Sequence, residues 1–267
     1  MLFPDRALAR RLEMHEAWSA REHARTQVRL YPETGASAQP AAEGYAVFCG
    51  RNSPLSQVYG WGASEPVRSA DLDGIQAFFR GRGLRTRIRA CPFSDPSLFH
   101  LLGERGYGVE GFMNVFARSL DGLDGDQPAL SGVRVGIAPA EEARGWFERY
   151  GADGDWAEPD GVAFMTIRTA QKADTQLFLA WIDGQPARGG ALEIHDGVAA
   201  LMAADTLPAY RKRGLHTLLL HARLAAATAA GCDLALVHTA PGSASQNNVL
   251  RAGFQLAYTA LTLVSPA

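Results

Sequence analysis

The sequence predicts an α/β (α+β) protein of two domains, each with a mixed, mostly antiparallel sheet flanked by helices. Strand-like and helix-like stretches alternate along 267 residues, and a domain usually takes about 100–200 residues. Both halves end in the same order of elements around a Gly-aromatic pair, Gly106–Tyr107 and Gly253–Phe254, about 147 residues apart, which is too long for a solenoid repeat. The Gly/Asp/Pro-rich segment 121–132 is typical of a linker. We therefore expect domains at 1–125 and 132–267.

Composition narrows the class of protein further. Hydrophobic residues make up 47% of the chain and the net charge is −2, so the chain is not of the disordered type and carries no overall basic field for nucleic acid. Three scattered cysteines, Cys49, Cys91 and Cys232, favour neither a disulfide framework nor a zinc site. They are typical of a reducing, cytoplasmic setting. No signal peptide, membrane anchor or membrane span is expected, because charges interrupt the apolar runs.

In the first half, residues 5–27 predict a helix, since they contain no Gly or Pro and are rich in Ala, Leu, Arg and Glu. Loop chemistry follows at 32–44. Asp71 and Asp95 are suitable N-caps for the two later helices. The remaining expected elements are strands at 44–50 and 57–63, a helix at 71–81, a strand at 85–91, a helix at 94–107, and a strand pair or one bent strand at 108–120.

In the second half, turn residues separate three apolar stretches that predict an antiparallel meander. A long Leu/Ala-rich helix is expected next, with Gly231 as its stop. The expected elements are a strand at 133–139, helices at 139–153 and 162–172, the meander at 176–184, 187–197 and 198–207, a helix over 210–231, a strand at 233–240, a short helix at 241–254 and a last strand at 254–264.

The densest basic cluster stands at the start of the long helix. Pro208 ends the preceding strand, and Arg211, Lys212 and Arg213 come before Gly214. The first N–H groups of a helix have no intrahelical partner and attract anions, and a glycine lets a ligand approach the backbone closely. The cluster therefore indicates a phosphate site, with a solvated basic turn as the alternative.

In this order of strand, turn, helix, strand and helix, the residues resemble the GNAT superfamily of acyl-CoA-dependent N-acetyltransferases. The turn motif is matched by Pro208, Tyr210, Arg211 and Gly214. The helix that ends in Gly-Phe before the last strand is matched by Ser243 to Phe254. The resemblance covers about residues 133–264 and implies two GNAT-like domains.

The resemblance implies a site for coenzyme A. The backbone amides of 212–217 would hold its pyrophosphate, a strand end would pair with its pantetheine arm as an added strand does, and the thioester would lie between strands 198–207 and 233–240. The cofactor-binding residues that follow are Ala204, Asp205, Thr206, Arg211, Lys212, Arg213, Gly214, Leu215, His216, Thr217, Ser245, Asn247 and Asn248. For the last three, capping and a solvated helix face remain an equal alternative.

Two positions depart from the family pattern. His216 stands where a small residue is usual, and its side chain either faces the ligand or points outward. Val249 stands where many members carry a tyrosine that protonates the leaving thiolate, so this acid is absent.

The general base or acid therefore remains open among several residues. Acyl transfer requires an amine held against the thioester, a polarised carbonyl and a base. The candidates are Glu193, Asp205, His238, Ser245 and Tyr258, with His195 beside the first. Each also has a purely structural interpretation, as a strand, turn or core residue.

The first half shows no comparable phosphate loop. Its segment before the helix at 71–81 carries Asp71 and Asp73, which would repel a pyrophosphate, and the fragment at 81–83 (GRG) lies at the wrong helix end. We expect a degenerate copy that packs against the active one or shapes the acceptor pocket. Aromatic and acidic residues between 146 and 164 line an acceptor pocket or serve as core and loop residues: Trp146, Tyr150, Trp156 and Phe164, and Asp153, Asp155, Glu158 and Asp160.

The expected activity is transfer of an acetyl group from acetyl-CoA to a primary amine of a small molecule or peptide, without a metal. A non-catalytic acyl-CoA-binding or regulatory protein is the alternative, and a nucleotide-binding module a third possibility. The chain would be a monomer or homodimer, with no nucleic-acid or membrane partner.

Overall fold

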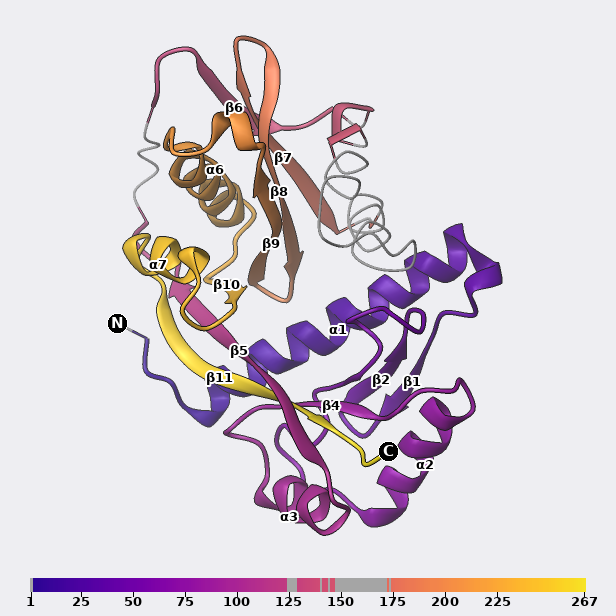
Figure 1. Ribbon diagram of the computed structural model, residues 1–267. Helices are drawn as coiled ribbons and strands as arrows, with labels where there is room; N and C mark the ends of the chain where they lie inside the picture. Colours follow the sequence, from indigo (N-terminus) through magenta and orange to yellow (C-terminus); the bar gives the residue numbers. More distant parts are fainter. Residues whose placement is uncertain (1, 124–128, 140, 144, 147–171, 173) are drawn as a thin grey trace. The chain divides into compact units, whose positions relative to one another are not determined.

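The computed structural model describes residues 2–123, 129–139, 141–143, 145–146, 172 and 174–267, and every structural statement concerns these residues. The chain forms two compact units. The N-terminal unit comprises Phe3–Val115 and Leu256–Ala267, and the C-terminal unit comprises Phe116–Gln255 together with Leu2. Figure 1 shows the elements of both.

Two strands connect the units. Strand β5 (Gly108–Ser119) begins in the N-terminal unit and ends in the C-terminal unit, whereas β11 (Gln255–Val264) leaves the C-terminal unit after its first residue. The chain therefore crosses near 115 and 255 rather than once in the expected linker. Because the last strand of the second half lies in the N-terminal unit, the compact units differ from the contiguous segments 1–125 and 132–267.

The N-terminal unit is a sheet in the order β1-β2-β3-β4-β11-β5, whose β1/β2, β2/β3 and β4/β11 pairs are antiparallel and whose β3/β4 pair is parallel. Asp5 caps the long helix by accepting from the Leu8 N–H. This helix packs against β1, β2 and β3. The elements are α1 (Arg6–Leu30), β1 (Ser37–Ala41), β2 (Gly44–Phe48), β3 (Val58–Tyr59), α2 (Ser69–Arg80), β4 (Arg87–Ala90) and α3 (Pro96–Glu104).

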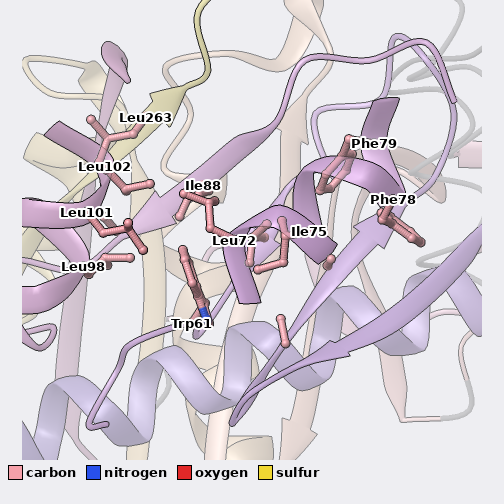
Figure 2. Packing of buried hydrophobic residues seen from close by; sticks show 14 of the residues in the cluster. Trp61, Leu72, Ile75, Phe78, Phe79, Ile88, Leu98, Leu101, Leu102 and Leu263 are labelled. Atoms are coloured by element: carbon pink, nitrogen blue, oxygen red, sulfur yellow. The ribbon is translucent and has the colours of Figure 1, made fainter. Parts of the chain in front are cut away.

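Aliphatic and aromatic side chains from α2, α3 and the sheet form the core of this unit (Figure 2). Trp61, Leu72, Phe79 and Ile88 are fully buried. Burial of a side chain of this size contributes about 1.5–3 kcal/mol. The spacing of Leu72, Ile75 and Phe79 along α2 is what turns one face of that helix toward the sheet.

Two expectations for the N-terminal half are wrong. The segment 32–44 contains strand β1, which pairs in full with β2. A proline is tolerated in β1 because β1 is an edge strand. Asp71 is not an N-cap: α2 begins after Arg68, and the Asp71 carboxylate pairs with the Arg68 guanidinium at 2.9 Å instead. Asp95 does cap α3, accepting from the Ser97 N–H.

The C-terminal unit continues the strand order as β5-β10-β9-β8-β7-β6. The expected meander is confirmed, since β6/β7, β7/β8 and β8/β9 are antiparallel, whereas β9/β10 is parallel. Its elements are β6 (Val133–Ile137), β7 (Thr175–Ile182), β8 (Gln185–His195), β9 (Val198–Thr206), α6 (Leu215–Ala229), β10 (Leu234–Thr239) and α7 (Ala244–Arg251). Most of the segments 139–153 and 162–172, where helices are expected, lies outside the described residues.

Helix α6 packs on the sheet through an apolar face that includes Leu215, Leu218 and Leu219. Phe116, near the end of β5, and Leu120, just after it, belong to the same core as Leu219 and Phe254. In a second hydrophobic cluster of this unit, Trp146 packs with Leu177 and Trp181. The C-terminal unit thus takes part of its core from a strand that begins in the N-terminal half of the sequence.

Candidate active site

The loop between β9 and α6 has an unusual backbone. A short 3-10 turn (Pro208–Tyr210) leads into Lys212, whose φ is 62°, and Gly214, whose φ is 75°. Glycine accepts a positive φ readily, but for lysine it costs about 1–2 kcal/mol. Strain of this kind is concentrated at functional sites. Gly214 is the N-cap of α6, and no side chain caps that helix.

The same backbone presents several N–H groups without acceptors. In the described part of the chain, nothing accepts from the amides of 212–216. The Thr217 N–H, expected to join them, donates to the Gly214 carbonyl at 3.1 Å. Consecutive free amides at a helix N-terminus and in a left-handed turn form an anion-binding concavity.

A cavity of about 610 Å³ opens at this loop. Five cations and a single carboxylate line it, which favours an anionic ligand. The lining residues are Arg188, Asp205, Thr206, Tyr210, Arg211, Lys212, Arg213, Gly214, Leu215, His216, Thr217, Ala244, Asn248 and Arg251.

Helix α7 contributes one of its faces to the cavity. Ser243 caps this helix by accepting from the Gln246 N–H. Ala244, Asn248 and Arg251 follow a helical spacing and line the cavity. Ser245 and Asn247 are exposed and are not among the lining residues, and neither is Ala204 of β9. Of the expected cofactor-binding residues, the structure therefore brings Asp205, Thr206, Asn248 and the loop 211–217 together at the cavity. Ala204, Ser245 and Asn247 do not line it.

His216 turns inward, toward the sheet. Its Nδ1 lies 2.9 Å from Arg188 Nη2, and because arginine can only donate, Nδ1 is the acceptor and Nε2 carries the proton. Burial, Arg188 and Arg223 lower the pKa of His216 to about 4, so the imidazole is neutral at pH 7. The Nε2 and Arg188 Nε are both shielded and without an acceptor in the described chain, and a buried donor left unsatisfied costs about 1–3 kcal/mol.

The two buried arginines near His216 have different partners. Arg188 donates to Thr206 Oγ1, and burial lowers its pKa to about 10 while Asp205 acts in the opposite sense. Arg223 of α6 is 2% exposed. Burial, with Arg188 as a second cause, lowers the pKa of Arg223 to about 9. Two buried guanidinium groups with so little negative charge around them favour an anion nearby.

Strand β9 has a bulge beside this cluster. Gly189 pairs with Asp205 and Ala191 with Met202, so two residues of β9 oppose Gly190 alone. Ala203, one of the two, has a φ of 49°. Arg223 Nη1 donates to the carbonyls of Ala191 at 3.0 Å and Met202 at 3.4 Å. Arg223 thus bonds to two carbonyls that lie beside the bulge.

Strands β9 and β10 stop pairing before they reach the bulge. Their parallel ladder pairs 198–200 with 234–236 and goes no further, although both strands continue to Thr206 and Thr239. The unpaired edges have free backbone groups at which an extended ligand can add as a strand does. This opening is where the thioester is expected.

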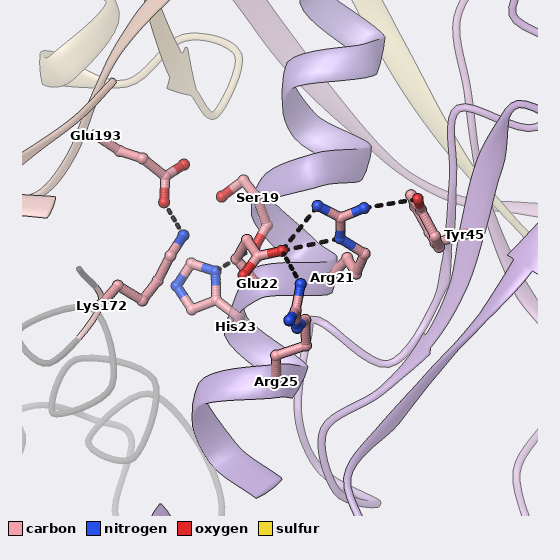
Figure 3. Close-up of polar contacts among 8 residues, drawn as sticks. All are labelled: Ser19, Arg21, Glu22, His23, Arg25, Tyr45, Lys172 and Glu193. Carbon is pink, nitrogen blue, oxygen red and sulfur yellow. Dashed lines mark hydrogen bonds and ion pairs between the residues drawn. The ribbon is translucent and has the colours of Figure 1, made fainter. Parts of the chain in front are cut away.

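The candidate bases occupy different surroundings. Asp205 lines the cavity. Glu193 of β8 is 0% exposed and forms an ion pair with Lys172 (Figure 3). His195 ends β8, away from the cavity lining.

His238 is half-buried on β10, beyond the last residue of the ladder, and Ser245 is exposed on α7. Tyr258 of β11 belongs to the N-terminal unit, where its hydroxyl donates to Glu13 Oε1 at 2.6 Å. Burial and Glu13 raise the pKa of Tyr258 well above its usual value.

The loop before α2 in the N-terminal unit donates to a carboxylate from the turn between β1 and β2. The Glu43 carboxylate accepts from the backbone N–H of Ser64 at 2.6 Å and of Glu65 at 3.3 Å, and the Gly62 carbonyl accepts from the Asp95 N–H. These two amides are therefore already bonded. That the first half is a degenerate copy without a phosphate loop stays a prediction.

Helix α1 carries ion pairs of its own, in which the Glu22 carboxylate contacts the guanidinium groups of Arg21 and Arg25 (Figure 3).

Among the described residues, no group of histidine, cysteine and carboxylate side chains is placed to hold a metal ion. Of the helices that the structure describes, none is both long and apolar enough to cross a membrane. Tyr150, Trp156, Phe164, Asp153, Asp155, Glu158 and Asp160 lie outside the described residues.

Besides Tyr210 and Ala244, three residues of the site, Arg188, Arg223 and Arg251, were not among the expected cofactor-binding residues. Arg251 could have been found, since it lies three residues after Asn248 on the same helix face. Arg188 and Arg223 had no such signal, because they come to the site from β8 and from the middle of α6 through tertiary packing.

The fold and the anion-binding loop define the class of protein. Residues 141–254 match the family described as acetyltransferase (GNAT) family. A GCN5-related N-acetyltransferase from Kribbella flavida is similar in structure, with a TM-score of 0.63, 21% identity and coverage of 93% of this chain and 96% of that one. A tandem GNAT protein from the clavulanic acid biosynthesis pathway has a TM-score of 0.65 at 15% identity, covering 92% of this chain and 87% of that one. No curated protein matches the sequence.

The chain therefore has the GNAT fold, and its segment 141–254 matches the GNAT acetyltransferase family. It is an acyltransferase.

Proposed function

We propose that the chain transfers an acetyl group from acetyl-CoA to a primary amine of a small molecule or peptide by direct attack. The observation that carries the proposal is the β9–α6 loop, where unbonded amides and Arg211, Lys212 and Arg213 face one cavity. Acetyl-CoA supplies an activated acyl group and a pyrophosphate. The loop residues would bind the pyrophosphate, and the unpaired end of β9 would bind the pantetheine arm.

The protein's part in the reaction is positioning, carbonyl polarisation and proton transfer. The amine nitrogen forms a bond to the carbonyl carbon, the carbon–sulfur bond breaks, and the amine proton passes to a base while the thiolate takes up another. Backbone N–H groups of the β9 bulge are suited to polarise the carbonyl. Asp205, His238, Glu193, Ser245 and Tyr258 remain the proposed acids and bases, with Asp205 supported by its place in the cavity.

Calorimetric titration with acetyl-CoA tests the cofactor. Gly214→Glu is the matched control, since it adds a carboxylate to the anion site at a residue with a φ of 75°. We expect binding by the parent protein and none by the variant. Absence of binding by the parent would contradict the proposal.

An acyl-CoA-binding protein without turnover is the second candidate, favoured by Val249, which is 1% exposed in the core and cannot protonate a thiolate. Thiol release from acetyl-CoA over a panel of primary amines separates the two. Turnover with any amine above the amine-free rate rejects the binding-only function. Displacement of CoA by ATP tests a nucleotide-binding module.

A further inference from the structure

A cavity of about 310 Å³ lies within the N-terminal unit and has no role in the proposed function. Its volume is at the lower end of the range for small-molecule sites, about 300–1,000 Å³. Three arginines and a single carboxylate line it, together with two apolar side chains. These residues are Arg51, Arg85, Arg87, Glu110, Leu84 and Val264.

The charges of this cavity do not balance. Glu110 is paired with Arg87, whose Nε and Nη2 each lie 2.8 Å from one of the two carboxylate oxygens. Arg85 donates from Nε and Nη2 to the Ser265 carbonyl, which is neutral. Arg51 has no carboxylate partner among the described residues. Two guanidinium charges at the cavity are therefore without a counter-ion in the described chain.

Local packing places Arg51 at the cavity. Its guanidinium lies against Gly83, where a Cβ would be 2.9 Å from Arg51 Nη2. The loop that carries Arg51 is fixed by the Ser56 hydroxyl, which donates to the Gly50 carbonyl at 2.6 Å and accepts from the Cys49 N–H at 3.0 Å. Arg51 is thus held by an ordered loop, and the glycine opposite leaves room for its guanidinium.

The backbone at this cavity is already satisfied and does not form a phosphate loop. Gly83 has a φ of 69° and follows the end of α2. The Gly83 N–H donates to the Arg80 carbonyl at 2.9 Å, and the Leu84 N–H donates to the Phe79 carbonyl at 3.1 Å. These two bonds are those of a Schellman cap. The fragment 81–83 therefore ends a helix, and an anion at this cavity depends on side chains alone.

We propose that this cavity binds a phosphoryl dianion, either free phosphate or the monoester of a small molecule, through Arg51 and Arg85. Guanidinium forks match the oxygens of phosphate and donate more than one bond to them, and Arg85 keeps its Nη1 for this purpose. A phosphate monoester carries about −1.5 to −2 charges at pH 7, which balances the two uncompensated cations. Leu84 and Val264 offer an apolar wall to the remainder of a monoester.

Calorimetric titration of the full chain with inorganic phosphate at low ionic strength tests the site. Arg51→Gln and Arg85→Gln should each weaken binding about tenfold, because each removes charge-assisted hydrogen bonds. Arg80→Gln is the matched control: Arg80 is an exposed arginine of α2 outside the lining, and its loss should leave affinity unchanged. Equal losses for all three variants would overturn the proposal, because they would indicate only the long-range field of the surface.

Phosphate also suits the basic loop before α6, and Lys212→Gln identifies binding there. Loss of phosphate binding in Lys212→Gln, with the affinity of Arg51→Gln and Arg85→Gln unchanged, would overturn the proposal, as would absence of binding by the parent. Two cavity variants are used so that a folding defect in one, detected by circular dichroism, leaves the other as the test.

Titration with glycerol 3-phosphate distinguishes the two sources of the dianion. Binding at least as tight as that of inorganic phosphate assigns the cavity to a monoester, and weaker binding assigns it to the free ion. Arg51→Gln should bind acetyl-CoA as the parent does. The site is independent of the acetyl-CoA proposal, so a parent that binds phosphate at this cavity but no acetyl-CoA refutes only the proposed function.

Discussion

The residues that define the site are strained or poorly solvated. Lys212 has a left-handed backbone, Arg188 and Arg223 are buried cations, and His216 holds a shielded donor. A sequence optimised for stability alone would replace several of them. An anion at the loop relieves the electrostatic cost of the cations and satisfies the amides. Single substitutions at these residues should therefore change stability, ligand binding and the pH dependence of unfolding.

The φ of Lys212 predicts opposite effects on stability and binding. Lys212→Gly removes the strain of a φ of 62° and is expected to stabilise the protein by about 1 kcal/mol. It also removes a charge from the cavity, so acetyl-CoA binding weakens. Thermal unfolding and calorimetry measure the two effects. Arg213→Gly, at a residue without a positive φ, is the control and should not stabilise; a lower melting temperature for Lys212→Gly contradicts the argument.

The pKa of His216 makes stability depend on pH. The group titrates near 4 in the folded protein but near 6.5 when unfolded, so the unfolded state binds the proton first as pH falls. Stability from this group is therefore complete above about 6.5 and decreases toward pH 4. Urea unfolding of His216→Asn should show a shallower loss of free energy than the parent over this window. Parallel curves would show that His216 is solvated.

At the scale of elements, the long-range features of the site are a bulge and a divergence between strands. The bulge at Ala203 releases backbone groups from the β8/β9 ladder, and β10 leaves β9 after Leu236. Arg223 stabilises the first feature by bonding to two carbonyls across it. Helix α6 thus presents amides at its start and supports the bulge from its middle.

Replacement of Arg223 tests this support. Arg223→Met removes the side-chain donor to the carbonyls of Ala191 and Met202, and we expect a loss of about 1–3 kcal/mol of stability. If the bulge positions the thioester, as we propose, kcat should fall by a larger factor than KM for acetyl-CoA changes. Thr228→Ala removes a hydroxyl that bonds within α6 to the Leu224 carbonyl and should leave kcat unchanged. Equal kcat for Arg223→Met and the parent refutes the positioning role.

At the scale of the whole molecule, the halves of the sequence exchange strands. Phe116 is 1% and Leu120 2% exposed, and both lie in the core of the C-terminal unit. The Leu120 N–H donates to the Asp233 carbonyl at 2.8 Å. A domain cut at the linker loses these residues.

We therefore expect the fragment 132–267 to be less stable by itself than as part of the intact chain. We expect this fragment to unfold at a lower temperature than the C-terminal half of the intact chain, and with less cooperativity, because burial of a large aromatic and a leucine side chain is lost. A fragment of residues 116–267, which keeps the end of β5, is the matched control and should recover part of the loss. Thermal unfolding followed by circular dichroism compares the intact chain with the fragments 132–267 and 116–267. Identical melts for both fragments would show that β5 is dispensable.

Several elements follow from local pattern. Asp5 and Asp95 cap their helices, and the meander from β7 to β9 forms as its turn residues predict, because caps and turns act within a few residues. Strand β1 was not predictable in this way, since its pairing with β2 and not its composition makes it a strand. Likewise, no local signal assigns β11 to the N-terminal unit or places Tyr258 against Glu13.

The sequence by itself determined the basic loop that we propose to bind an anion, because Pro208, the basic residues and Gly214 are contiguous and their backbone forms the loop. Only the tertiary structure decided which side chains join it. Arg188 arrives from β8, Arg251 from α7 and Arg223 from beneath the bulge, and their approach depends on strand register and helix packing. The inward direction of His216 follows from one of these distant contacts, since Arg188 fixes the ring and its tautomer.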